Sequence, residues 1–296
     1  KLLVDANADL AAKDNNGFTA LHWAAHLGKT ECVQPLLDAK ANIEATDNNG
    51  YTALHRAIDE RQTGCAKLLI AAKPNLEVTD KYGNTALILA AINHQTECLE
   101  LLVGAKADIE AKNNEGISVL QWAVRNCETS CVKLLVEKKA NIMAKCHYGY
   151  TALHHAAGED PSDSPQLLLD AKADLEARTN AGETALYLAA HWDDNAYAQF
   201  LVEAKANLEA ADPDGYTPLI VAAREGRMDC LELLIKAKAN LNAVDINGYT
   251  PLIWAVLKGQ IECMRSLVDA KANVQAKDNS GCTALIWAAR DGRIEC

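Results

Sequence analysis

The chain of 296 residues has no excess of positive charge and no long apolar segment. Its formal net charge is −11 at pH 7. This argues against binding to nucleic acid or to an anionic membrane surface, because both depend on clustered Lys and Arg. The sequence also lacks an apolar run of the roughly 18 residues that a membrane-spanning helix needs. We therefore predict a soluble chain that neither binds nucleic acid nor inserts directly into a membrane.

Motifs for catalysis and metal binding are missing as well. There is no nucleophile elbow, no phosphate-binding glycine loop and no H-E-x-x-H pair, each of which positions groups that a particular reaction needs. No C-x-x-C pair is present either, so zinc has no ligands at the usual spacing. We expect no enzyme activity, no cofactor and no metal site within these residues. An enzyme domain elsewhere in a longer protein is compatible with the sequence.

An internal repeat of 33 residues is the strongest signal in the sequence, and no copy gains or loses a residue. A fixed period of this size indicates a single extended array rather than two globular domains. The repeat is marked by Gly17, Gly50, Gly83, Gly116, Gly149, Gly182, Gly215, Gly248 and Gly281. Complete copies cover 17–49, 50–82, 83–115, 116–148, 149–181, 182–214, 215–247 and 248–280, with partial copies at 1–16 and 281–296. Because arrays need polar capping repeats at their ends, we expect these residues to be the middle of a longer protein.

Each repeat is predicted to contain two helices and a turn. In the second repeat Thr52 is a hydroxyl residue suited to begin a helix, and Leu54 and Ala57 follow on one face of that helix. The segment from Cys65 to Ile70 has the apolar spacing of a second helix. The stretch "NIEATDNNGYT" alternates apolar and polar residues around Asp47–Gly50, and Asp first and Gly fourth suit a type I turn. A short hairpin, or finger, is therefore expected between helix pairs.

Segments such as "DNNGYTALHRAI" and "DNSGCTALIWAA" resemble ankyrin repeats, whose period is also 33 residues. The resemblance covers the whole chain. It implies an all-α repeat solenoid with short β-hairpin fingers, in which the fingers and first helices line a concave groove. His22, His55 and His154 match the histidine of the ankyrin "TPLH" motif, which implies a structural hydrogen bond at each repeat junction.

A lysine follows nearly every second helix, in stretches such as "DAKANIEA" at residues 38–45. Ankyrin repeats have glycine here, because the backbone turns left-handed just past the helix end. We expect the lysines to adopt that conformation at a cost of roughly 1–2 kcal/mol, which the helix dipole offsets in part. The alternative is a basic ridge, which acidic neighbours on both sides weaken. The row consists of Lys40, Lys73, Lys106, Lys139, Lys172, Lys205, Lys238 and Lys271.

Seven of the ten cysteines occupy one repeat position: Cys32, Cys65, Cys98, Cys131, Cys230, Cys263 and Cys296. Equivalent Cα atoms in stacked repeats lie ~10 Å apart, whereas a disulfide needs less than ~7 Å. We therefore predict buried, reduced cysteines without disulfides, and an intracellular, cytoplasmic location. Cys127, Cys146 and Cys282 lie outside this row and are expected to be more exposed.

Four histidines and one cysteine from adjoining repeats near the middle of the array are residue types that can bind a metal. Ligands from different repeats would have to converge within ~2.0–2.3 Å of one ion, which separate structural layers seldom allow. We therefore interpret these residues as structural or exposed rather than as ligands. They are Cys146, His147, His154, His155 and His191.

The resemblance implies that partners contact the finger tips and the ends of the first helices. There the chain has Phe18, Tyr51, Tyr82, Tyr148, Tyr150, Tyr216 and Tyr249 on the fingers, with His26, Arg125, His191, Trp192, Arg224 and Arg290 at the helix ends. Tyr, Trp and Arg are enriched in interface hot spots. We predict partner contacts for Tyr51, Tyr82, Arg125, Tyr148, Tyr150, His191, Trp192, Tyr216 and Arg224. The alternative for the tyrosines is packing against neighbouring fingers.

Departures from the repeat pattern concentrate in the central copies. The first helix is followed by Gly28, Gly226, Gly259 and Gly292 in outer copies, but by Arg61, His94, Cys127, Asp160 and Asp193 between them. The fifth copy contains "GEDPSDSP", whose prolines Pro161 and Pro165 should delay or shorten its second helix. The sixth reads "HWDDNAYAQF", both aromatic and acidic. We interpret the fourth to seventh repeats as the main contact surface, and sequence drift is the alternative.

These features predict a scaffold or adaptor that binds a protein partner through the groove of the array, without chemistry of its own, because stacked repeats offer a large preorganised surface. Two alternatives stay open. One is a structural component of a large cytoskeletal or ciliary assembly. The other is a regulatory or targeting array of a larger enzyme or channel.

Overall fold

The computed structural model describes residues 2–126, 128–157 and 163–295. The chain divides into two compact units, one of residues 1–147 with 162–167 and the other of residues 148–161 with 168–296. Among the described residues no helix combines the length and the apolar content that crossing a bilayer requires.

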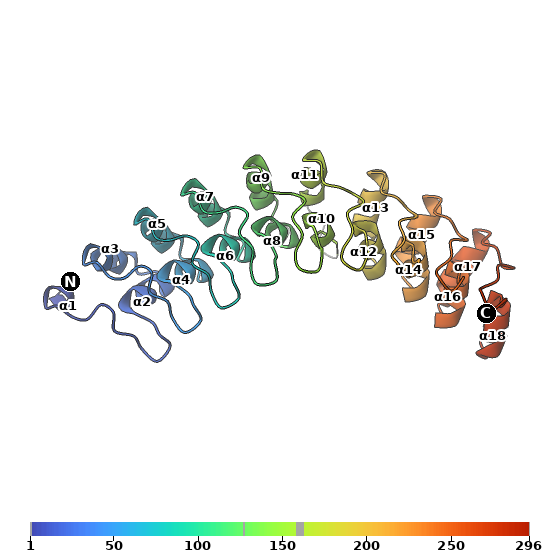
Figure 1. The fold of residues 1–296 in the computed structure, drawn as a ribbon, viewed down its shortest axis with the longest axis horizontal. Helices are drawn as coiled ribbons and strands as arrows, with labels where there is room; N and C mark the ends of the chain where they lie inside the picture. The colour runs from blue at the N-terminus through green and yellow to red at the C-terminus, as the bar shows by residue number, and fades with distance from the viewer. Residues whose placement is uncertain (1, 127, 158–162, 296) are drawn as a thin grey trace. The chain divides into compact units, whose positions relative to one another are not determined.

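In the first unit the helices form two rows (Figure 1). The helices that open each repeat, called inner helices here, pack against one another, and so do the outer helices that close each repeat. A one-turn helix, α1 (Leu2–Asp5), comes first. The inner helices are α2 (Ala20–His26), α4 (Ala53–Asp59), α6 (Ala86–Ile92) and α8 (Val119–Arg125), and the outer ones are α3 (Thr30–Asp38), α5 (Thr63–Ala71), α7 (Thr96–Gly104) and α9 (Thr129–Glu137).

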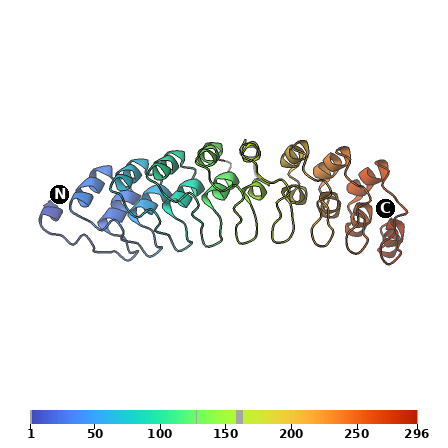
Figure 2. The same ribbon diagram turned by 45° about the horizontal axis from the view of Figure 1, so that its top comes forward.

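The second unit repeats the same arrangement. Its inner helices are α10 (Ala152–His155), α12 (Ala185–Trp192), α14 (Pro218–Glu225), α16 (Pro251–Lys258) and α18 (Ala284–Arg290), and its outer helices are α13 (Asn195–Glu203), α15 (Met228–Lys236) and α17 (Ile261–Asp269). Helix α11 (Ser164–Asp170) has residues in both units. The fingers, defined as the segments between an outer helix and the next inner helix, extend past the row of inner helices within each unit (Figure 2).

Each inner helix begins after a hydroxyl residue, as predicted. Thr217 has extended backbone, with ψ 164°, and its side chain accepts the backbone N–H of Ile220 at 3.3 Å. This bond satisfies one of the donors that a helix start leaves free. Pro218 and Pro251 occupy the first helical position, where a missing N–H costs nothing.

The fingers turn back on themselves without forming strands in the described residues. In the second finger Asp47 N–H donates to Tyr51 O at 2.9 Å and Gly50 N–H donates to Asp47 O at 3.0 Å. The Asp47 carboxylate accepts two further backbone N–H groups, from Asn49 and Tyr51. The Asp47 side chain therefore supplies hydrogen bonds that paired strands would supply to each other in a longer hairpin. One isolated bridge, between Lys112 and Ser118, is the nearest approach to the predicted β-hairpins.

Successive fingers are joined by a line of backbone hydrogen bonds at 2.9–3.1 Å, in which the second residue of a finger tip donates to the preceding tip. Gly17 shows why the tip needs glycine: its φ is +80°, and a Cβ there would lie 2.8 Å from the Asn48 backbone nitrogen. Pro213 occupies the donor position in its finger, so no such bond forms there. The described donor–acceptor pairs are Asn48–Asn16, Lys81–Asn49, Asn114–Tyr82, His147–Glu115, Asn180–Tyr148, Ile246–Asp214 and Asn279–Asn247.

The glutamate of the recurring "KANIEA" stretch joins neighbouring repeats. Glu44 Oε1 accepts the backbone N–H of Asn75 at 2.7 Å, and Asn242 does the same for Asn273 through its side-chain oxygen at 2.9 Å. A charged acceptor makes a stronger hydrogen bond than a neutral one. The same bond is made by Glu77, Glu110, Glu176 and Glu209.

The lysine row ends the outer helices, as predicted. Lys40 has φ +64°, and all eight lysines lie in the left-handed region with φ between 57° and 73°. Lys40 N–H donates to Leu37 O and Ala41 N–H to Leu36 O, each at 2.9 Å. These two bonds are the helix-ending pattern in which glycine normally supplies the left-handed residue.

Burial of the cysteine row is confirmed for Cys65, Cys98, Cys131, Cys230 and Cys263. Two predictions were wrong. Cys32 is exposed, because the one-turn α1 does not cover α3 as a full helix pair covers later repeats. Cys146 is buried rather than exposed, with 6% of its surface accessible, because it occupies the first position of its finger tip, where Asp47 and Asp80 are buried as well. Cys282 is half-buried, whereas Cys127 and Cys296 lie outside the described residues.

The fifth repeat has shorter helices than its neighbours. Its outer helix α11 begins at Ser164 and has 7 residues, whereas α9 and α13 have 9. This agrees with the prediction from Pro165; Pro161 and Asp160 lie outside the described residues. The inner helix α10 has only 4 residues, a shortening that the sequence did not predict.

Candidate partner-binding surface

In both units several fingers are fixed to their inner helix by one recurring hydrogen bond. In these fingers the first residue of the tip is an aspartate whose Oδ2 accepts a hydrogen bond from the helix residue nine positions later. Trp23 Nε1 donates to Asp14 at 3.0 Å, Trp254 Nε1 to Asp245 at 3.0 Å, and Trp287 Nε1 to Asp278 at 2.8 Å. Because Oδ1 accepts two backbone N–H groups, as in Asp47, the aspartate sets both the finger and the indole ring. Backbone donors to the carboxylate lower the pKa of Asp14.

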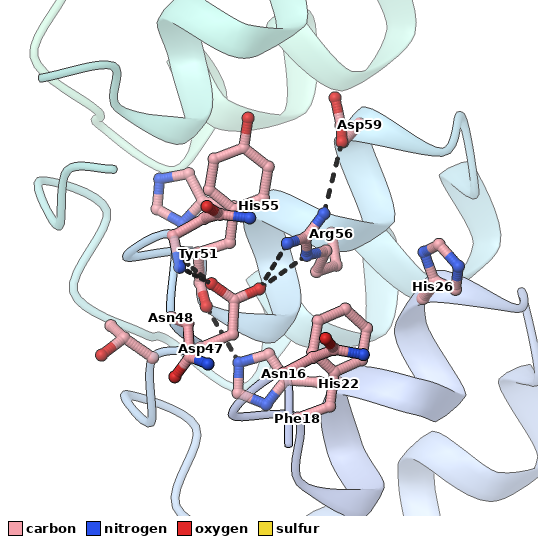
Figure 3. Close-up of polar contacts among 12 residues, drawn as sticks. Asn16, Phe18, His22, His26, Asp47, Asn48, Tyr51, His55, Arg56 and Asp59 are labelled. Carbon is pink, nitrogen blue, oxygen red and sulfur yellow. Dashed lines mark hydrogen bonds and ion pairs between the residues drawn. The ribbon is translucent and has the colours of Figure 1, made fainter. Parts of the chain in front are cut away.

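Arg56 replaces the tryptophan in the second repeat (Figure 3). Its Nε and NH2 groups contact Asp47 Oδ2 at 2.7 and 2.6 Å, and NH1 lies 3.7 Å from Asp59. The guanidinium packs between the rings of Phe18 and Tyr51, at 4.8 and 4.3 Å from their centroids. Only 11% of the Arg56 side chain is exposed and none of Asp47. This arginine is therefore neutralised and enclosed, and it holds the finger rather than a partner.

His22 and His154 hold the repeat junction, as the resemblance implied for the motif histidines, whereas the corresponding bond from Nε2 of His55 does not form. Thr19 N–H donates to His22 Nδ1 at 3.2 Å, so Nδ1 is the acceptor and the proton is on Nε2. Nε2 then donates to Tyr51 O in the next finger at 2.9 Å (Figure 3). His154 makes the same pair of contacts with Thr151 and Glu183. Burial lowers the pKa of His55 to about 4, which keeps this ring neutral at pH 7.

The first unit contains three of the predicted contact residues, and they differ in accessibility. Tyr51 is half-buried against His55 and Arg56, and burial raises its pKa to about 12. Tyr82 is 57% exposed, with Lys81 over its ring. Arg125 is exposed and lies 5.3 Å from the Trp122 ring. Tyr51 thus packs on its own inner helix α4, which is neither the predicted partner contact nor packing against a neighbouring finger, whereas Tyr82 and Arg125 are accessible.

The second unit contains the other six. Tyr148 is 64% exposed and Trp192 is 46% exposed, which leaves both rings accessible to a partner. His191 packs edge-on against Trp192 at 6.1 Å. Tyr150 is half-buried and its ring lies 5.5 Å from that of His155.

Part of the aromatic and acidic character of the sixth repeat belongs to the core. Tyr197 occupies the repeat position of the buried cysteines, is 6% exposed, and donates its hydroxyl to Leu153 O at 2.6 Å. Asp193 has φ +62° and accepts the N–H of Cys230 at 3.2 Å, while Asp194 accepts that of Tyr197. Burial raises the pKa of the Cys230 thiol, and nearby Asp193 adds to the shift.

The last two predicted residues, Tyr216 and Arg224, belong to a larger aromatic cluster. The Arg224 guanidinium lies 5.0 Å from the Tyr216 ring and 5.4 Å from the Trp254 ring. Trp254 stands at the fourth position of α16, so it belongs neither to the finger tips nor to the helix ends, where the resemblance places partner contacts. The recurrence of tryptophan at that position, as Trp23, Trp122, Trp254 and Trp287, was the available signal.

Metal binding has no geometric support in the part of the chain that the structure describes, where no three His, Cys, Asp or Glu side chains converge. The polar groups of both units instead bond to the backbone and to each other, as shown above for the histidines and aspartates. The indole rings that bond to aspartates are thus held in fixed positions by these hydrogen bonds.

This architecture defines a helical repeat protein built from stacked helix pairs. A family model of three ankyrin repeats matches residues 1–80, 41–113, 87–179, 162–245 and 237–296, which together span the chain. The chain belongs to the ankyrin repeat family. Among solved structures it is similar to the crystal structure of the ankyrin repeat domain of Bcl-3, described as a unique member of the IkappaB protein family. The TM-score is 0.64 at 28% identity, over 74% of this chain and 99% of that one. No curated protein matches the sequence.

Ankyrin repeats are generally protein-interaction modules, without catalytic groups of their own.

Proposed function

We propose that this chain is a scaffold or adaptor that holds a protein partner against its fingers and inner helices. The observation that carries the proposal is the exposure of Tyr148 and Trp192 in the second unit, at 64% and 46%. Neither ring is needed to fill the core. Large rings with accessible faces cost little conformational entropy when they bind, and they dominate the energetics of many interfaces.

Two further observations support the proposal. Most fingers are fixed before any partner arrives, because backbone hydrogen bonds join them to the preceding finger and several are also bonded to their inner helix. Preorganised surfaces lose less entropy on binding. The eight cysteines of the described residues are free, which supports an intracellular location, where thiols stay reduced.

The test compares the intact chain with the variant Tyr148→Ala/Trp192→Ala as bait in an extract of the native source. Proteins retained by the intact chain are identified by mass spectrometry, purified, and titrated against both baits by calorimetry. The double variant should bind the partner at least about 30-fold more weakly, as the loss of hot-spot contacts worth ~2 kcal/mol would require.

A matched control changes two exposed outer-helix residues, Glu232→Ala/Lys236→Ala. This control should leave the partner affinity within about two-fold. Circular dichroism and thermal unfolding establish that all three proteins are folded. Equal affinity of the intact chain and the Tyr148→Ala/Trp192→Ala variant would rule out this surface as the binding site.

A further inference from the structure

Four aromatic side chains form a continuous line in the second unit, here called the aromatic ladder: Tyr216, Trp254, Tyr249 and Trp287. The ring of Trp254 lies 5.8 Å from Tyr216 and 5.3 Å from Tyr249, and Tyr249 lies 5.9 Å from Trp287. These contacts alternate between fingers and the inner helices α16 and α18. Aromatic pairs at this spacing attract each other beyond their burial, so the line is held as a unit.

Three cations lie against the aromatic ladder, one from each of three successive inner helices. Arg224 is near the end of α14, Lys258 ends α16, and Arg290 ends α18. Lys258 Nζ lies 5.7 Å from the Trp254 centroid, and the Arg290 guanidinium lies 4.6 Å from that of Trp287. Each ring face therefore holds its cation in place by a cation–π contact.

The charges of these cations are only partly balanced within the chain. Arg224 has Glu225 at 3.2 Å. Lys258 and Arg290 are both exposed and form no ion pair with any residue that the structure describes. A cation near a helix C-terminus is favoured by the dipole. That accounts for the residue type but supplies no counter-ion.

The two aspartates that bond the indoles of Trp254 and Trp287 have all their carboxylate oxygens in hydrogen bonds within the chain. Asp245 Oδ1 accepts two backbone N–H groups and Oδ2 accepts Trp254 Nε1. Asp278 is bonded in the same way to its own finger and to Trp287. Both carboxylates are buried, at 4% and 6% exposure. Asp214, in the finger of Tyr216, is exposed, so the cations are the accessible charges beside Trp254 and Trp287 rather than beside Tyr216, in a chain whose net charge is −11.

We propose that the aromatic ladder with Arg224, Lys258 and Arg290 binds an extended acidic segment of a partner protein. The inference rests on the proposed function and names the chemistry of the partner. Adjacent inner helices pack about 8–10 Å apart, and an extended chain rises about 3.3 Å per residue. Carboxylates at about every third residue of the segment would therefore meet successive cations, while the side chains between them lie on the rings.

The test uses a fluorescein-labelled synthetic peptide with three glutamates, one at every third position, separated by glycine and serine. Fluorescence anisotropy with the full chain at about 50 mM salt should show saturable binding that weakens as salt rises, because the contacts are exposed charges. A peptide with glutamine in place of glutamate should bind at least about ten-fold more weakly. Absence of binding by the glutamate peptide would overturn the proposal.

Variants locate the site. Lys258→Gln/Arg290→Gln should weaken binding of the glutamate peptide about ten-fold. The matched control, Lys236→Gln/Arg265→Gln, removes the same charge from exposed positions on the outer helices α15 and α17 and should change the affinity less than about two-fold. Equal losses in both variants would mean that net charge alone attracts the peptide, and the proposal would fail.

Two further comparisons test the spacing of the glutamates and distinguish the acidic-segment inference from the proposed scaffold function. A peptide with its three glutamates adjacent should bind more weakly than the spaced peptide, and equal affinity would overturn the proposed spacing. The purified partner should lose affinity in the Lys258→Gln/Arg290→Gln variant. If it responds to Tyr148→Ala/Trp192→Ala alone, the acidic-segment inference fails while the scaffold function stands. If it responds to neither pair, both proposals fail.

Discussion

Trp122 Nε1 is buried and has no hydrogen-bond partner, because Asn113 stands where other fingers have aspartate. Asn113 Oδ1 accepts the backbone N–H groups of Glu115 and Ile117, each at 3.0 Å. The other terminal atom of the Asn113 side chain is the amide nitrogen, which cannot accept a hydrogen bond from the indole. In the finger of Trp254 the corresponding atom is Oδ2 of Asp245, which does accept it.

The substitution Asn113→Asp should therefore stabilise the array by about 1.5–3 kcal/mol, the range for a hydrogen bond to a charged group. Urea unfolding at pH 7 measures the gain. In a Trp122→Phe background the indole donor is absent and the gain should vanish, which makes a double-mutant cycle. The same gain with and without Trp122 would show that the carboxylate acts through another contact.

Loss of the Arg56 guanidinium should be severe. Arg56→Leu leaves the Asp47 carboxylate buried without its charged partner, so we expect the free energy of unfolding to fall by about 3–5 kcal/mol. Arg56→Trp should retain much of the stability, because Trp23 and Asp14 form the corresponding bond. Chemical unfolding of both variants measures the difference. Equal stability of the two would mean that the Asp47 contact contributes little.

Acid should destabilise the array through its motif histidines. Burial lowers the pKa of His55 from the ordinary histidine value of 6.5 to about 4 in the folded chain, so between these values the unfolded chain binds more protons. The stability that neutral His55 contributes is thus complete above about pH 6.5 and is lost as pH falls towards 4, by up to about 1.4 kcal/mol per pH unit. Unfolding measured from pH 7.5 to 4.5 should show the decline.

A substitution found within the array itself provides the control for this pH effect. Gln121 takes the histidine position in the fourth repeat, where it accepts from Ser118 N–H and donates to Ala144 O. His55→Gln should therefore fold at pH 7 and lose less stability in acid than the wild-type chain. An unchanged pH profile would place the acid sensitivity elsewhere.

The left-handed lysines predict opposite effects for two residues that are close in sequence. Lys238 has φ +67°, so Lys238→Gly should relieve strain and stabilise the array by about 1 kcal/mol. Lys236 lies in the last turn of α15, so Lys236→Gly should destabilise it by up to about 1 kcal/mol. Thermal unfolding of the two variants decides. A loss of stability in both variants would show that the Lys238 side chain stabilises the array by some contact beyond ending the helix.

The fold was predictable because the repeat multiplies every local signal. Nine hydroxyl caps and eight lysines each stand at one position of a constant period, so one unit determined the rest. The exposure of single residues was harder to predict. Cys32 was predicted to be buried but is exposed, and Cys146 was predicted to be exposed but is buried, because burial depends on the neighbouring layer, which the pattern of one repeat does not describe. The finger-to-helix bonds were also missed, because they join side chains nine positions apart that show no simple helical spacing.

Pro213 has a mechanical consequence. Elsewhere in the second unit, separating two neighbouring fingers requires a backbone hydrogen bond to break, as between Ile246 and Asp214. Between the sixth and seventh fingers Pro213 has no N–H to donate, and the fingers are joined instead by the Arg178 side chain, whose NH1 donates to Ala211 O. A long side chain can follow a change in finger spacing that a direct backbone hydrogen bond would resist. A bound partner whose dimensions do not match the regular pitch of the repeats would be accommodated there, while the spacing on either side stays constant.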